Sequence, residues 1–297
     1  MINSIDEYLN SLKVALKGCD SATIQDALAD AEEHLRTAIE QGLEESDKVV
    51  EADILVAIIE KYGTPDEIAT AYRDIEDRIR PAFARTQVSN NKSIVSRFFG
   101  IFADAGAWGS LIYMIFALVT GIIFFTWAVT GISIGISMIF LIIGIPIIIL
   151  FLYSVRGIGF VEGRLVEALL GERMPRRTKF TNRNIKLWDR IKELLTDRTS
   201  WTGILYMILQ LPIGIIYFTF MIVMLSVSIS TVFAPLINII WDIPIVSHTG
   251  DFEYFLPNWI FPLITIAGFL LLTITMHIAK FIGKIHGKYA KALLVCE

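Results

Sequence analysis

The sequence predicts an all-helical membrane protein, in which a small acidic four-helix bundle precedes a polytopic domain of four membrane-spanning helices. Hydrophobic residues make up 54% of the 297-residue chain and charged residues only 19%, and the mean hydropathy is +0.60. A soluble domain is nearer a quarter charged. Residues 105–155 contain no charged side chain. As one helix this stretch would be more than twice as long as a bilayer core is thick, so it must fold back.

Charge is divided between the two parts of the chain. Residues 1–80 hold 19 acidic and 8 basic side chains, whereas the remainder holds 11 acidic and 18 basic ones. An acidic head on a basic membrane part indicates two modules. It also argues against nucleic acid as a direct ligand of the head.

Four amphipathic helices are expected in residues 1–83, which we predict to form a separate cytosolic domain. The first begins at Ser4, with Glu7 placed for a capping box, and the second runs from about Ser21 to Gly42. The fourth has the clearest start, because Thr64 suits the cap and Pro65 suits the first helical position. Each helix has one apolar face, so the four should pack as a bundle. Residues 84–92 are polar and aperiodic and are expected to be a linker.

This head resembles the HAAS signalling domain, an all-helical cytosolic module. The resemblance rests on Tyr8-Leu9 with Leu12 and Leu16, on the acidic stretch at 31–35, and on Tyr-Gly-Thr-Pro-Asp-Glu-Ile-Ala at 62–69. The resemblance implies a membrane-tethered protein of a kind often encoded beside PadR-like transcriptional regulators.

The membrane domain is expected to occupy residues 93–297. The uncharged runs place spans at about 109–130, 134–154, 202–225 and 258–279, with the first turn near Thr130–Gly135. Amphipathic segments at 94–102 and 187–195 are expected to lie on the inner leaflet as interfacial helices.

An internal duplication organises this domain into units 93–171 and 186–297. When the sequence is aligned with itself at an offset of 93 residues, aromatic and glycine positions match through the first span of each unit. After the second span of each unit, an offset of 124 residues gives the match. Trp108, Tyr113, Gly121 and Thr126 thus fall on Trp201, Tyr206, Gly214 and Thr219, and Gly159 and Gly163 fall on Gly283 and Gly287. Two spans per unit give both units the same orientation, so they should be related by an axis along the membrane normal.

Orientation follows from lysine and arginine. The loop at 156–198 carries eleven of them and the C-terminal tail four, whereas residues 226–257 carry none. The positive-inside rule therefore predicts a multi-pass protein of the cell membrane with both termini in the cytoplasm.

The repeat pair resembles the family called putative sensor domains, four-span input modules of some prokaryotic histidine kinases. The matching residues are Trp-x4-Tyr at 108–113 and 201–206, Gly121 with Gly214, and Gly-Arg-Leu-Val-Glu-Ala-Leu-Leu-Gly at 163–171. The sequence contains neither a phospho-acceptor helix nor an ATP-binding glycine motif. Output is therefore expected to pass through the head or the central loop.

The second unit has 31 extra residues outside the membrane, which hold the candidate ligand-binding site. Carboxylates among aromatic side chains suit a cation or a cationic amphiphile, and hard oxygen ligands suit a divalent cation. A solvated loop without a ligand is the alternative. The candidate residues are Trp241, Asp242, His248, Asp251, Glu253 and Tyr254.

Catalytic and cofactor motifs were not found, so we expect a non-enzymatic protein with no cofactor and no resident metal. His34 is expected to be a packing or surface residue, and His277 to be the only ionisable side chain within a span. Glycines spaced by four should allow close helix packing at Gly131 and Gly135, Gly159 and Gly163, and Gly283 and Gly287.

The sequence therefore predicts a membrane signalling protein that senses through its spans and outer loop and signals through its acidic head. Its expected partners are membrane lipids, a cytosolic protein such as a PadR-like regulator and, in an oligomer, further copies of the chain. The alternative function is a membrane scaffold or an oligomeric transport or lipid-binding component.

Overall fold

The computed structural model describes residues 4–45, 51–78, 94–138, 144–176, 196–241, 246–249, 252–255 and 257–295. The head consists of α1 (Ile5–Ala15), α2 (Ser21–Glu45), α3 (Glu51–Tyr62) and α4 (Pro65–Arg78). The membrane part consists of α5 (Ile94–Phe99), η1 (Gly100–Ala103), α6 (Ala105–Ser137), α7 (Gly144–Leu170), α9 (Arg198–Trp241), η2 (Asn258–Ile260) and α10 (Phe261–Leu294). Strands β1 (Val246–Thr249) and β2 (Phe252–Phe255) form a small antiparallel hairpin. The predicted all-helical head and four-span membrane domain are confirmed, with this hairpin as an addition.

The head packs its four helices around one apolar core that includes Tyr8, Leu12, Leu35 and Leu55. Its caps are those that the sequence predicts. The Glu7 amide donates to Ser4 Oγ at the start of α1, and the Thr64 amide donates to a Glu67 carboxylate oxygen at the start of α4. The second helix is longer than expected, because Gly42 lies inside α2 and does not end it.

Four helices of the described residues, α6, α7, α9 and α10, are long and apolar enough to cross a membrane. The predicted turn near Thr130–Gly135 is wrong, because α6 continues to Ser137. Inside a bilayer the backbone amides must bond within the helix, so glycine does not end it there. Instead, the Phe151 and Ile148 side chains of α7 pack beside Gly131 and Gly135.

The third span is also longer than predicted. The helix does not end near residue 225 but runs on to Trp241, with Pro235 inside it. The extra residues of the second unit are therefore partly a helical extension of α9 and partly the β1–β2 hairpin. Of the two predicted interfacial segments, 94–102 is helical as α5 and η1, whereas most of 187–195 lies outside the described residues.

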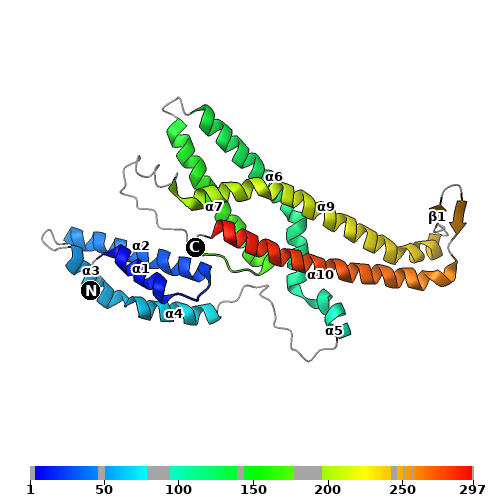
Figure 1. Ribbon diagram of the computed structural model, residues 1–297, viewed down its shortest axis with the longest axis horizontal. Coiled ribbons are helices and arrows are strands. Elements are labelled where there is room, and N and C mark those ends of the chain that lie inside the picture. The colour runs from blue at the N-terminus through cyan, green and yellow to red at the C-terminus, as the bar shows by residue number, and fades with distance from the viewer. Residues whose placement is uncertain are drawn as a thin grey trace.

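The helix pairs α6–α7 and α9–α10 cross each other, and the middle of α6 packs against α9 (Figure 1). Gly121 of α6 lies against the Gln210 carbonyl of α9, and Gly214 of α9 lies against the Ala117 carbonyl of α6. A Cβ atom on either glycine would overlap the facing helix. These contacts exchange when the sequence is shifted by 93 residues, so the two helices make equivalent contacts at the crossing.

Two ion pairs repeat the same symmetry at the ends of the hairpins. Asp104 caps α6 and pairs with Lys280 of α10, whereas Asp197 precedes α9 and pairs with Arg156 of α7 at 2.7 Å. The second span of each unit is thus joined by an ion pair to the start of the first span of the other unit.

Candidate functional site

The predicted outer-loop residues are only partly described. Trp241 is the last residue of α9 and is 65% exposed. The hairpin register places His248 opposite Glu253 and Ser247 opposite Tyr254. Asp242 and Asp251 lie outside the described residues. Binding by this loop stays a prediction.

The predicted packing glycines lie at contacts between elements. Gly131 and Gly135 face α7, as described above. The other four glycines lie on α7 and α10. Gly159 lies near Leu294, Gly163 near Met174, Gly283 near Ser110 and Gly287 near Glu172.

A cluster of buried polar side chains lies where the two hairpins cross. The hydroxyls of Tyr113 and Tyr206 both donate to Glu162 Oε1, at 2.6 and 2.9 Å. His286 Nε2 lies 2.7 Å from the Tyr113 hydroxyl, and the Gln210 amide donates to the same hydroxyl at 3.3 Å. All five side chains are at most 2% exposed. We call these five residues the buried polar cluster.

Each of the four spans contributes to this cluster. Tyr113 comes from α6, Glu162 from α7, Tyr206 and Gln210 from α9, and His286 from α10. Tyr113 matches Tyr206 under the 93-residue shift, and Glu162 matches His286 under the 124-residue shift. The cluster therefore consists largely of matched positions, with a carboxyl group in one predicted unit and an imidazole in the other.

Besides His277, two ionisable side chains of the buried polar cluster lie on the candidate membrane helices, beyond the spans that the sequence predicts. The helices α7 and α10 continue to Leu170 and Leu294 and carry Glu162 and His286. His277 lies against α5, with Nε2 3.0 Å from the Phe98 carbonyl oxygen. Fully buried ionisable groups on membrane helices are costly and often serve a function, so the buried polar cluster is the stronger candidate site.

The sequence signal for this cluster was present in the duplication. The shift of 124 that matches Gly159 and Gly163 with Gly283 and Gly287 also places Glu162 on His286. Both residues follow the charge-free runs, so hydropathy alone assigns them to the loop and the tail.

The head contacts the membrane part close to this cluster. Asp20, which caps α2, pairs with Lys291 of α10 at 2.5 Å. Asp26 of α2 accepts a hydrogen bond from the Arg176 amide in the segment after α7. Figure 1 shows the end of α10 beside α2. The helices that carry Glu162 and His286 are therefore the ones that lead to the head.

Buried side chains of the head have shifted pKa values. Burial, with Glu67 nearby, raises the pKa of Tyr8 to about 12, and burial together with Asp30 raises that of Tyr62 further. Burial also raises the pKa of the Cys19 thiol, beside the contact with α10. His34 stacks on Tyr62 with ring centroids 4.4 Å apart, as expected for a packing residue.

These features define a four-span membrane protein with a helical head docked at its cluster-bearing helices. A model of the family described as Putative sensor matches residues 80–294, so the chain belongs to this family. The model of the HAAS family matches residues 7–71. No curated protein and no solved structure matches the chain. The two families together indicate a signalling or sensor role.

Proposed function

We propose that this chain is a non-enzymatic membrane sensor that receives its signal through the spans and the outer loop. The acidic head passes the signal to a cytosolic partner such as a PadR-like regulator. Both termini lie in the cytoplasm, which the lysines and arginines of 156–198 and of the tail support.

The observation that carries this proposal is the continuity between the buried polar cluster and the head. His286 and Lys291 lie on one helix little more than a turn apart, and Lys291 pairs with Asp20 of the head. A change in how the hairpins cross would rotate or shift the end of α10. It would thereby loosen the head, because packed helices switch between discrete arrangements.

Partner recruitment by the full chain in nanodiscs tests this relay. Docking covers the first turns of α2, so releasing the head should expose them to a PadR-like regulator. Lys291→Asp should increase the amount of regulator retained, because the new carboxylate repels Asp20 and releases the head. Combining it with Asp20→Lys restores the opposite charges and should restore the parental level. Lys284→Gln, on the exposed side of the same helix, is the control. Equal retention by the parent and Lys291→Asp would refute the relay.

The outer loop is proposed as the input site for a cation or cationic amphiphile. The probes are Ca²⁺ and dodecyltrimethylammonium, added to the full chain in nanodiscs of neutral lipid. The triple substitution Asp242→Asn, Asp251→Asn and Glu253→Gln should abolish binding of the probe that the parent binds. If neither probe binds the parent, or if the triple variant binds like the parent, the loop is not the input site.

A further inference from the structure

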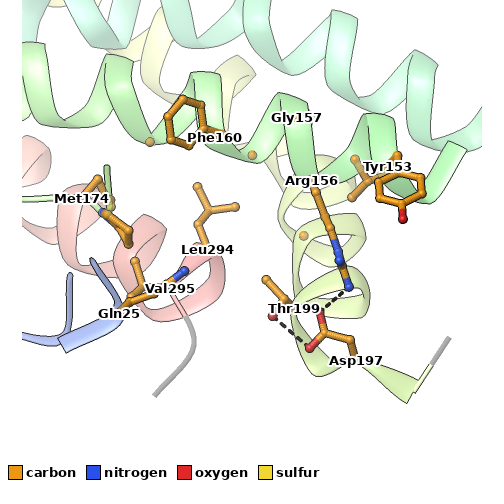
Figure 2. Close-up of a pocket in the computed structure, with 15 residues that line it drawn as sticks. Gln25, Tyr153, Arg156, Gly157, Phe160, Met174, Asp197, Thr199, Leu294 and Val295 are labelled. Atoms are coloured by element: carbon orange, nitrogen blue, oxygen red, sulfur yellow. Dashed lines mark hydrogen bonds and ion pairs between the residues drawn. The ribbon is translucent and has the colours of Figure 1, made fainter. Parts of the chain in front are cut away.

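A cavity of about 310 Å³ lies between the head, α7 and the first turns of α9 (Figure 2). This volume is at the lower end of the roughly 300–1,000 Å³ range of small-molecule sites. Its apolar walls include Phe160, Met174, Leu294 and Val295, and Gln25 of the head closes one side. The cavity is thus lined by the head, by α7 with the segment after it, and by α9 and α10.

Beside this cavity the two units differ at matched positions. In one unit, Gly283 lies against the Ser110 side chain and near Leu170, which leaves no room. At the equivalent place, Ser110 is replaced by Gly203, and only Leu294 approaches Gly159. The matched ion pairs are kept on both sides, so the architecture is the same and the difference is the open space.

A basic hollow adjoins the cavity and shares Val295 with it. Arg198, Lys288 and Lys291 line this hollow, together with Ser21 of the head. Lys291 is paired with Asp20, but Arg198 and Lys288 are exposed and have no ion pair within the described part of the chain. The hollow therefore presents two uncompensated positive charges next to an apolar cavity.

The position of this pair of hollows suits the membrane boundary. Trp201 lies between Arg198 and Gly203 on α9 and is 57% exposed, as is typical of aromatic residues at that boundary. A molecule that enters from the inner leaflet would meet the cations with its polar end and the cavity with its apolar end.

We propose that this composite site binds an anionic amphiphile, with its carboxylate or phosphate at Arg198 and Lys288 and its alkyl chain in the cavity. Lysine and arginine attract anionic head groups at a membrane surface. Burial of the alkyl chain against Phe160 and Leu294 provides the apolar part of the affinity. Because Gln25 and Ser21 line the two hollows, the bound molecule also contacts the head. This binding does not depend on what the head recruits.

Native mass spectrometry of the full chain in neutral detergent tests the proposal. The probes are tetradecanoate, phosphatidylglycerol and, as an uncharged control, tetradecanol. We expect the parent to retain one anionic probe and not tetradecanol. Retention of only tetradecanoate would identify free acyl anions as the source, and retention of only phosphatidylglycerol would identify a membrane lipid.

Two variants test the two halves of the site. Arg198→Gln with Lys288→Gln should weaken retention by roughly 10- to 30-fold, because each cation contributes about a fivefold effect. Gly157→Phe installs the residue that the other unit has at the matched position, Phe281, and should block the cavity. A Cβ at Gly157 meets no atom within 4 Å, so this substitution should not disturb the fold.

Matched controls are Lys284→Gln, one turn from Lys288, and Val161→Phe, on an exposed face of α7. Both should retain the probe like the parent. The proposal is overturned if the parent retains neither anionic probe or retains tetradecanol equally. It is also overturned if Gly157→Phe or the double charge variant binds like its control.

Discussion

The buried polar cluster shows how a few residues join the two hairpins. Each tyrosine hydroxyl has one proton and directs it at Glu162 Oε1, which leaves the Tyr113 oxygen to accept from Gln210 and His286. Fully buried polar groups are costly unless they are hydrogen-bonded. The cluster therefore favours the one crossing arrangement in which these bonds can form.

Removing either hydroxyl should destabilise the membrane domain. Tyr113→Phe and Tyr206→Phe should each lower the free energy of unfolding by about 1–2 kcal/mol, because a buried hydrogen bond to Glu162 is lost. Each effect should shrink in a Glu162→Gln background, since the residues form one network. Thermal unfolding of the full chain in detergent measures these differences.

Tyr289→Phe provides the matched control for that series. The Tyr289 hydroxyl is buried beside the cluster but has no hydrogen-bond partner among the described residues. Its removal should therefore cost little. Strictly additive effects of the tyrosine and Glu162 substitutions would show that these residues act separately.

The elements show which structural features local sequence can predict. Thr64 and Pro65 start α4 as expected, because a cap depends on neighbouring residues alone. The first membrane turn lies later than the sequence predicts, because Gly131 is a packing position beside Phe151 and, inside a bilayer, does not end the helix. The pairing of Glu162 with two tyrosines was missed for a similar reason, since its partners are 44 and 49 residues away.

The cap of α4 predicts a pH dependence at that helix. The Thr64 amide, and then its hydroxyl, donate to Glu67 and hold the pKa of that carboxyl below its usual value of 4.5. Its stabilising effect is therefore present above the unfolded-state pKa and is lost as pH falls through the folded-state pKa. Hydrogen exchange of the amides of Thr64, Asp66, Glu67 and Ile68 in the full chain should show protection that falls as pH drops below about 4.5.

Glu67→Gln separates this titration from general acid unfolding. The amide side chain does not titrate, so protection of the first turn of α4 should be lower at pH 6 and should change less on acidification. Asp74→Asn, on the same helix outside the capping box, controls for the loss of one acid. The same pH profile in the parent and in Glu67→Gln would contradict the assignment.

The whole molecule combines a symmetric membrane part with a head docked on one side. The crossing at Gly121 and Gly214 and the two ion pairs repeat in both units, whereas the cavity beside Gly203 and the hairpin β1–β2 do not. The matched contacts are what the predicted duplication would produce. The departures from symmetry are the places where we propose ligand binding.

Thiol labelling of intact cells tests the proposed orientation. A cysteine at Gly250 should react with a membrane-impermeant reagent added outside, because 226–257 carries no lysine or arginine. A cysteine at Thr178, in the loop rich in arginine, should react only after the cells are permeabilised. Labelling of Thr178→Cys in intact cells would contradict the predicted orientation.

We propose that the way in which the two helix pairs cross controls whether the head is docked. A water-soluble carbodiimide joins a carboxylate to an amine only when they are in direct contact, so it can report the Asp20–Lys291 pair in native membranes. The Asp104–Lys280 pair within the membrane part is the internal reference. We predict that mass spectrometry finds both cross-links in the parent. In the double variant Tyr113→Phe with Tyr206→Phe, the Asp20–Lys291 yield should fall severalfold against the unchanged reference. A parent that forms only the reference cross-link, or an equal ratio of the two cross-links in parent and variant, would contradict the claim.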